Sequence, residues 1–305
     1  MTDALVDGLR SFNRTVTQRI GVLESDYLTR DRPLGQSRVL WEIGANGSGI
    51  SRGCDIRELR ARLGLDSGYL SRLLRALEGG GLIEVNAADG DTRVRTARLT
   101  PTGHAELSEL DRRSDDLARS ILEPLSIDQR RRLADAMAEV ERLFVASQVQ
   151  TAVMDTRAPE ARYCIRAYFD EISARFSGGF DPALTLPAGD TELCAPAGLF
   201  LVATLHEEPV GCGGLKLLRN AGGIIETAEI KRVWISPNVR GMGLGKRILA
   251  ELEQLAIAHG AGTIRLDTNR ALTEAIAMYR SAGYGEVAAF NDEKYAHHWF
   301  EKPLS

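Results

Sequence analysis

The 305-residue sequence has no apolar run as long as the roughly 18 residues that a membrane-spanning helix needs. Its opening stretch, MTDALVDGLRSFNR, contains acidic residues and no apolar core, which argues against a secretory signal. The four cysteines lie far apart, without a C-x-x-C spacing or a nearby histidine pair. This pattern opposes a zinc site and favours reduced thiols, so we expect a cytoplasmic protein with no metal and no membrane partner.

Lysine is absent from the first 150 residues, which contain 22 arginines and 23 acidic residues. The remainder has 16 basic and 19 acidic residues, so neither half is basic and a globally basic nucleic-acid binder is excluded. Within residues 52–98, however, nine arginines outnumber seven acidic residues. A local basic patch can still bind phosphate, because screening over about 8–10 Å lets the nearest charges dominate.

The length predicts about two domains at roughly 150 residues each. Hydrophobic residues make up 44% and charged residues 26% of the chain, as in ordinary globular proteins. The hydrophobic pattern changes from mainly helical to mixed strand and helix after residue 148, with no Pro- or Gly-rich linker. We therefore expect two domains, 1–147 and 151–305, joined by a short connection.

The first domain is expected to be rich in helix. Apolar residues recur at helical steps, and the predicted helices cover residues 4–25, 36–45, 55–63, 66–78, 101–122 and 126–147. Alternating strands over 82–85 and 93–100, joined by a turn-rich loop, form a hairpin between the fourth and fifth helices. Two short helices with a tight turn, followed by a hairpin, predict a winged helix-turn-helix.

A winged helix-turn-helix binds DNA because a helix fits the major groove while the hairpin reaches the backbone or minor groove. The second helix of the pair carries polar side chains at positions that its leucine core does not use. Such side chains can bond phosphates and base edges. The candidate DNA-binding residues of this helix and the hairpin are Ser67, Gly68, Tyr69, Ser71, Arg72, Arg75, Arg93 and Arg95.

Two stretches of the first domain, LDSGYLSRLLRALEGGGLI and DGDTRVRTARLTPTGHAEL, resemble the MarR family of bacterial regulators. The resemblance covers residues 1–147 and includes the Asp91-Thr-Arg93 wing motif. It implies a homodimer built from the first and last helices, with Ser67–Leu77 in a major groove. It also implies a palindromic operator in double-stranded DNA, since a two-fold dimer mirrors a two-fold site, and association with the nucleoid when bound.

The most informative run of the second domain is AEIKRVWISPNVRGMGLGKRILAELE. A predicted strand over 228–235 precedes a turn with glycines at 241, 243 and 245, and a helix follows over 244–259. Such a turn lets backbone N–H groups converge on an anion at the start of the helix. A dinucleotide-binding fold would need a different glycine spacing, and a P-loop would need Ser or Thr after Lys246.

The spacing Arg240-x-x-Gly243-x-Gly245 resembles the Q/R-x-x-G-x-G/A motif of GNAT acetyltransferases. Leu266-Asp-Thr-Asn269, followed by Tyr279 and Gly283-Tyr284, matches that family's second block, and the resemblance covers residues 151–305. It implies an α+β fold with a central mixed, mostly antiparallel sheet, and acetyl-CoA as co-substrate. The implied coenzyme-binding residues are Val233, Trp234, Ile235, Arg240, Gly241, Met242, Gly243, Leu244, Gly245, Lys246 and Asn269.

The resemblance also implies catalytic roles. The pyrophosphate would lie on the N–H groups of 240–246, and the pantetheine would run beside Val233–Ile235. An acceptor amine is mostly protonated at pH 7 and must lose a proton before it attacks. Glu229 is the candidate base, and Tyr279 is the candidate acid for the departing thiolate. Direct acetyl transfer to a primary amine, on a small molecule or a protein, is expected.

Three functional hypotheses follow from the two resemblances. The first is a fused transcriptional regulator and N-acetyltransferase, and we prefer it. The second is a transcription factor whose GNAT-like domain senses acetyl-CoA without turnover. The third is an acetyltransferase whose winged helix serves only dimerisation.

Overall fold

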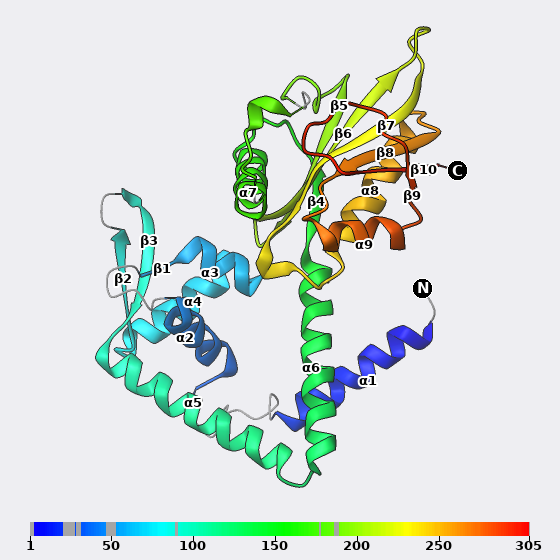
Figure 1. Cartoon of the computed structure of the whole chain (residues 1–305). Coiled ribbons are helices and arrows are strands. Elements are labelled where there is room, and N and C mark those ends of the chain that lie inside the picture. The colour runs from blue at the N-terminus through cyan, green and yellow to red at the C-terminus, as the bar shows by residue number, and fades with distance from the viewer. Residues whose placement is uncertain are drawn as a thin grey trace. The chain divides into compact units, whose positions relative to one another are not determined.

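The computed structural model describes residues 3–20, 28, 32–46, 53–88, 91–176, 178–185 and 189–304, and Figure 1 labels their elements. The side chains of residues 46, 88 and 91–93 lie outside the described part. The chain divides into two compact units, Met1–Asp135 and Ala136–Ser305.

The first unit consists of helices with one small antiparallel sheet, in the strand order β1-β3-β2. Its elements are α1 (Asp3–Arg19), α2 (Leu34–Asn46), β1 (Cys54–Asp55), α3 (Ile56–Leu63), α4 (Ser67–Gly79), β2 (Ile83–Ala88), β3 (Asp91–Leu99) and α5 (Pro101–Leu122). Helix α6 (Ile127–Gln148) continues into the second unit. The two domains are thus of the predicted kinds, and residues 21–25 of the first predicted helix lie outside the described residues.

Local capping chemistry fixes the α3–α4 pair. The Asp55 carboxylate accepts a hydrogen bond from the Arg57 N–H at 2.6 Å, and Asp66 accepts one from the Tyr69 N–H at 2.8 Å. Gly64 ends α3 with φ +61°, a conformation that suits glycine. The predicted leucine face of α4 is buried against α2, which confirms the helix-turn-helix; its members are Leu70, Leu73, Leu74 and Leu77.

Helices α1 and α6 have no buried residue among those described. Both nevertheless present large apolar side chains to solvent. On α1 these are Leu5, Leu9 and Phe12, and on α6 they are Ile127, Met137, Leu143 and Phe144. The α1 residues recur at four- and three-residue steps and therefore form one stripe. An amphipathic helix that leaves its apolar stripe exposed normally meets a partner surface.

The second unit is built on a seven-stranded sheet in the order β4-β5-β6-β7-β8-β10-β9. Its strands are β4 (Gln150–Val153), β5 (Gly198–Leu205), β6 (Glu208–Arg219), β7 (Ile225–Ile235), β8 (Thr263–Thr268), β9 (Gly285–Val287) and β10 (His298–Pro303). Its helices are α7 (Pro159–Arg175), α8 (Leu244–Ala258) and α9 (Thr273–Ser281). Neighbours are antiparallel except for the parallel pair β7–β8, which confirms the mixed, mostly antiparallel sheet.

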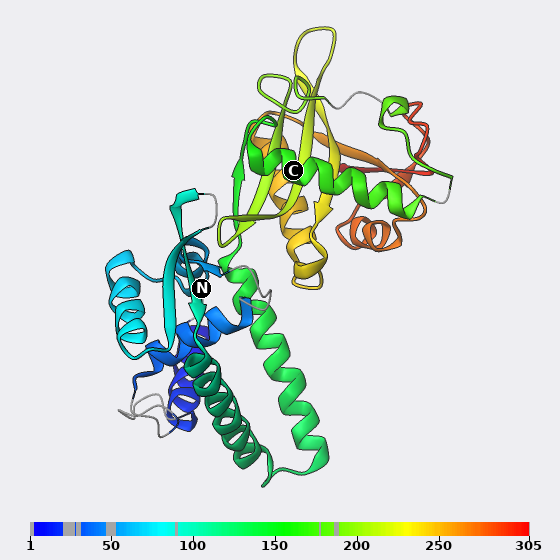
Figure 2. The same ribbon diagram turned by 90° about the vertical axis from the view of Figure 1, so that its left-hand side faces the viewer.

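Helices α7 and α8 cover opposite faces of this sheet (Figure 2). Adjacent residues of β5 belong to separate apolar clusters: Phe200 packs with residues of α7, whereas Leu201 packs with residues of α8. Successive strand side chains point to opposite faces, so two cores sandwich the sheet. No described helix is long and apolar enough to cross a membrane.

Strands β7 and β8 separate soon after they meet. Their parallel pairing runs only from Thr227–Thr263 to Glu229–Arg265. Farther along β7, Lys231 pairs with Gly214 and Trp234 pairs with Cys212, so two β7 residues face one β6 residue. This bulge contains Arg232, whose φ is +53°. The end of β7 is therefore left without a partner strand on its β8 side.

Candidate active site and nucleic-acid interface

Two clefts meet where β7 and β8 separate. The first, the α8 cleft, lies between the end of β7, the start of α8, and α9, and has a volume of about 1230 Å³ that includes space open to solvent. The second, the β8 cleft, lies between β7, β8, α7 and the segment before β10, and has a volume of about 840 Å³ measured in the same way. The clefts share six lining residues: Tyr168, Ile172, Val233, Leu272, Ala275 and Tyr279. The two clefts therefore adjoin at these residues.

The glycine-rich turn gives the α8 cleft its shape. Gly241 and Gly243 have φ of +79° and +78°, and a Cβ on either would meet nothing within 4 Å. No side chain caps the N-terminus of α8 at Gly243. The N–H groups of the first turn have no partner within a helix, so they face open space that suits an anion. A Cβ on Gly245 would approach the Met278 Sδ to 2.9 Å, so this glycine lets α8 and α9 pack closely.

Most of the predicted coenzyme-binding residues line the α8 cleft. They are Val233, Trp234, Ile235, Arg240, Gly241, Gly243, Leu244, Gly245 and Lys246. Met242 and Asn269 do not line it. Met242 lines a smaller pocket beside Val149 and Arg247. Asn269 lines the β8 cleft instead, where its Nδ2 donates to the Tyr295 carbonyl oxygen at 2.7 Å.

The Glu171 carboxylate of α7, which sequence reasoning missed, organises one wall of the α8 cleft. It accepts a hydrogen bond from the Trp234 indole N–H at 3.0 Å and forms an ion pair with Arg240. The Arg240 guanidinium also donates to the Ile235 carbonyl oxygen at 2.9 Å. The motif arginine therefore holds the end of β7 and α7 together through its side chain. No local sequence signal links Glu171 to this turn.

Tyr279 lies at the junction of the two clefts and is 6% exposed. Its ring packs against Tyr284 and Phe300, with centroids 6.0 and 6.1 Å away. Burial, assisted by the negative charge of Asp267, raises the pKa of the Tyr279 hydroxyl well above its ordinary value. The hydroxyl therefore keeps its proton at physiological pH and can act as a donor.

Glu229 lines neither cleft. Its side chain pairs with Lys231 at 2.7 Å and with Arg265 at 3.1 Å. Burial by itself raises the pKa of Glu229, but the charges and hydrogen bonds of Lys231 and Arg265 outweigh burial and lower it. This position does not favour the role of base that the sequence suggested, because the carboxylate is enclosed by two cations.

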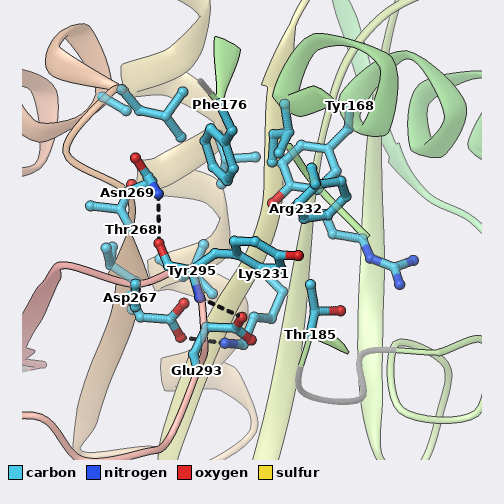
Figure 3. Close-up of a pocket in the computed structure, with 18 of the residues that line it drawn as sticks. Tyr168, Phe176, Thr185, Lys231, Arg232, Asp267, Thr268, Asn269, Glu293 and Tyr295 are labelled. Atoms are coloured by element: carbon cyan, nitrogen blue, oxygen red, sulfur yellow. Dashed lines mark hydrogen bonds and ion pairs between the residues drawn. The ribbon is translucent and has the colours of Figure 1, made fainter. Parts of the chain in front are cut away.

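Lys231, Asp267 and Glu293 lie together at one end of the β8 cleft (Figure 3). Lys231 forms ion pairs with Glu229 and with Asp267, and the Asp267 Oδ1 also accepts from the Asn291 amide at 3.1 Å. Glu293 lies beside this group and accepts from the Tyr295 N–H at 3.3 Å. Sequence reasoning did not select these residues, although Asp267 lies within the Leu266–Asn269 motif.

The predicted DNA-binding residues whose side chains the structure describes lie on the exposed side of α4 and of the hairpin. Ser67, Ser71, Arg75 and Arg95 line a groove of about 710 Å³ between α3, α4 and the β2–β3 hairpin. Gly68, Tyr69 and Arg72 are exposed outside the groove, and the Arg72 guanidinium lies 5.6 Å from the Tyr69 ring centroid. Arg93 is in β3, but its side chain lies outside the described residues.

Two further arginines of α3, Arg57 and Arg60, line the same groove. Sequence reasoning counted them in the local charge but did not select them as contacts. Their three-residue spacing places them on one face of α3, and this spacing is the feature of the sequence that could have identified them as DNA contacts. In the described part of the chain, no group of three or more His, Cys, Asp or Glu side chains could hold a metal ion.

Comparison with known proteins agrees with both halves of this description. The model of the acetyltransferase (GNAT) family matches residues 165–284, and that of the MarR family matches residues 30–93. An IAA acetyltransferase of Azospirillum brasilense is 32% identical over 117 residues, which are 38% of this chain and 74% of that protein. The chain therefore belongs to the GNAT acetyltransferase family and also carries a MarR family domain.

Two more distant similarities concern the same region or fold. The uncharacterized N-acetyltransferase YjgM of Escherichia coli is 29% identical over 92 residues, or 30% of this chain and 54% of that protein. The solved structure of a GNAT family acetyltransferase from Staphylococcus aureus Mu50 is 17% identical, with a TM-score of 0.44. That match covers 52% of this chain and 99% of the other.

The Glu229 ion pairs predict a pH-dependent contribution to stability. Because the pKa of Glu229 is lowered from 4.5, its contribution is full above that value and is lost as the pH falls through the lower pKa of the folded state. Glu229→Gln should lower the free energy of unfolding by about 3 kcal/mol at neutral pH, since it leaves buried cations undercompensated. Urea unfolding followed by tryptophan fluorescence measures the difference.

The exposed Glu208→Gln is the matched control and should change stability little at any pH. The difference between Glu229→Gln and the natural chain should shrink when unfolding is repeated below the ordinary glutamate pKa. A difference that stays constant from neutral to acidic pH would contradict the assignment.

Proposed function

We propose that this protein is a bifunctional transcriptional regulator and acetyl-CoA-dependent N-acetyltransferase that transfers acetyl directly to a primary amine. In this proposal residues 1–147 bind DNA and dimerise, and residues 151–305 carry out acetyl transfer. The observation that carries the enzymatic part is the junction of two clefts at Tyr279. One cleft has the backbone geometry of an anion site, and the other has charged and aromatic walls.

The α8 cleft fits acetyl-CoA, which supplies the acetyl thioester when it is bound. The uncapped start of α8 and the open space over Gly241 and Gly243 suit a pyrophosphate. The unpaired β8 side of β7 suits an extended chain beside Val233–Ile235, because its backbone groups have no partner strand there. Asn269 is less suited to contact that chain, since its amide holds Tyr295 and its Oδ1 accepts from the Ala271 N–H.

Proton transfers are assigned to residues that line the clefts. Tyr279 donates a proton to the leaving sulfur, which its raised pKa permits. Asp267, rather than Glu229, takes the proton of the acceptor ammonium through water, since it is a carboxylate that lines the β8 cleft. Glu229 then acts as a positioning residue, because it shares Lys231 with Asp267.

Direct transfer is favoured because none of the four cysteines lines either cleft.

The bulge at Arg232 and Val233 also supports catalysis. A bulge leaves backbone groups out of the strand ladder, and a free N–H can then polarise a carbonyl oxygen. In this proposal, the chain positions the acceptor, moves two protons and polarises the reacting carbonyl.

The first test concerns coenzyme binding. Gly243→Glu should abolish acetyl-CoA binding measured by calorimetry, because its side chain would enter the space proposed for the pyrophosphate and repel it. Gly223→Glu, at a remote turn with φ +80° and equally open surroundings, is the control for strain and added charge. Unchanged affinity of a folded Gly243→Glu protein would sink the proposed pyrophosphate site.

The second test concerns turnover. Tyr279→Phe should keep acetyl-CoA affinity but slow thiol release by about 10²-fold, the lower range for loss of a general acid. Tyr284→Phe is the matched control, because Tyr284 packs against Tyr279 but lines neither cleft. Full activity of Tyr279→Phe on a verified acceptor would show that this tyrosine only packs. Normal acetyl-CoA binding without thiol release for any amine would instead favour a coenzyme sensor.

The DNA-binding part of the proposal rests on the arginines around the α4 groove. A palindromic operator would be contacted by two protomers, each placing the exposed side of α4 in a major groove. We propose that the exposed apolar stripe of α1 and the exposed apolar side chains of α6 make the homodimer, since neither helix buries a residue among those described. The small-molecule or protein nature of the acceptor does not affect this part.

The third test separates phosphate contacts from base contacts. Arg95→Ala should weaken operator binding and lower the salt slope by about one unit, as expected for a lost phosphate contact. Arg72→Ala should cost about 1–3 kcal/mol if it removes a base contact. Fluorescence anisotropy at several salt concentrations measures both. Arg219→Ala, in the second unit, is the control, and unchanged binding by both test variants would favour a winged helix used only for dimerisation.

A further inference from the structure

The β8 cleft contains an arginine whose charge is not neutralised. Arg232 lines the cleft and is half-buried. Its guanidinium lies 5.0 Å from the Phe169 ring centroid, and among the described residues its side chain forms no ion pair or hydrogen bond. The nearby acidic residues Asp190 and Glu192 already pair with Arg162 at 2.6 Å and Lys216 at 2.8 Å. Burying an uncompensated cation costs free energy, which a bound anion would recover.

The backbone at Arg232 is also unusual. Its φ of +53° belongs to the left-handed region. Residues other than glycine, asparagine and aspartate are uncommon there, above all those with long side chains. Such strained residues cluster at functional sites, and here the strain occurs in the bulge beside the junction of the two clefts. Figure 3 shows the result: the Arg232 side chain extends away from Lys231, Asp267 and Glu293. The cleft therefore has an acidic end and a separate cationic side.

The charges of this cleft match a molecule that carries both signs. Lys231 and Arg232 are its positive lining residues, and Asp267 and Glu293 are its negative ones. Lys231 is neutralised by the pairs it forms with Glu229 and Asp267. One guanidinium is therefore left for one carboxylate, which arginine can hold by two parallel hydrogen bonds. The single positive charge of Arg232 matches the charge of one carboxylate better than that of a phosphate dianion.

The remaining wall of the cleft is aromatic. Six of the chain's 8 Phe and 7 Tyr residues line it: Tyr168, Phe169, Phe176, Phe180, Tyr279 and Tyr295. The Phe180 ring centroid is 5.8 Å from that of Phe169 and 5.0 Å from that of Tyr295. Phe176 packs on both Phe180 and Tyr295, at 5.8 and 5.9 Å. A continuous aromatic surface of this kind favours an apolar, planar group on the ligand.

We infer that the acceptor is a free amino acid with an aromatic side chain, whose carboxylate binds Arg232 and whose ring packs on the Phe176–Phe180–Tyr295 wall. This inference rests on the proposed acetyltransferase function and specifies its substrate. The nitrogen of the amino group forms the new amide bond, the acetyl–sulfur bond breaks, and the sulfur leaves as the thiol with a proton. The ammonium loses one proton to Asp267 through water before it attacks. Tyr279 protonates the leaving sulfur, and the second proton that the nitrogen loses restores the Tyr279 hydroxyl. The N-terminal residue of a peptide has no free α-carboxylate that could bind Arg232, so a peptide acceptor is disfavoured.

The experiment compares L-phenylalanine, L-phenylalaninamide and L-alanine as acceptors for the full chain. The natural chain should use phenylalanine about 100-fold better, in kcat/KM, than the amide, which lacks the carboxylate, because a desolvated charge pair contributes about that much. Alanine should also be poor, since it leaves the aromatic wall uncovered. Arg232→Gln should lower kcat/KM for phenylalanine about 100-fold relative to kcat/KM for the amide, so that the preference for the free carboxylate disappears.

Arg219→Gln is the matched control, since this arginine donates to the Gly223 carbonyl oxygen and lines neither cleft. Equal use of phenylalanine and its amide, or an intact preference in Arg232→Gln, would overturn the Arg232–carboxylate assignment. Equal use of alanine and phenylalanine would overturn the role of the aromatic wall.

Calorimetric measurement of phenylalanine binding distinguishes a wrong substrate assignment from a protein that has no acetyltransferase activity. If no amine releases thiol, the proposed turnover fails. Binding of phenylalanine that is lost in Arg232→Gln would still support the ligand class. Absence of phenylalanine binding to the natural chain would overturn it.

Discussion

Pairing between β7 and β8 stops at Glu229 and Arg265, and the rest of the site depends on this separation. Parallel strands that stayed paired would bury the edge of β7 in the sheet. Because they part, β7 keeps an unpaired edge up to Ile235, and the α8 and β8 clefts lie on the two sides of one short junction. The bulge at Arg232 occurs at the same place and shifts which side chains face the opening.

A buried ion cluster stabilises the point where the strands separate. Glu229 and Arg265 form the last parallel pair, and their side chains also form an ion pair. Lys231, two residues farther along β7, forms ion pairs with both Glu229 and Asp267 of β8. Opposite charges therefore connect the two strands where backbone hydrogen bonds no longer do. Asn291 adds a neutral hydrogen bond to Asp267 from the segment before β10, which forms part of the cleft wall.

The first unit follows a simpler physical plan. Capping side chains and a positive-φ glycine define α3 and α4, and leucines bury one face of α4. The opposite face is left polar and basic, next to a hairpin that adds Arg95. Capping and leucine spacing are local features, so the helix pair was predictable. The charged groove required three elements to come together, and it added Arg57 and Arg60 to the expected residues.

The glycine turn at 241–245 and the capped ends of α3 and α4 were determined by the sequence alone, because each depends on neighbouring residues. The role of individual carboxylates was decided by the tertiary structure. Glu229 and Asp267 both appear as acidic residues of strands, and only strand pairing shows that Asp267 lines a cleft while Glu229 is enclosed by Lys231 and Arg265. Arg232 gave no sequence signal either. A bulge interrupts the two-residue alternation of a strand, so the direction of its side chain depends on the pairing of β7 with β6.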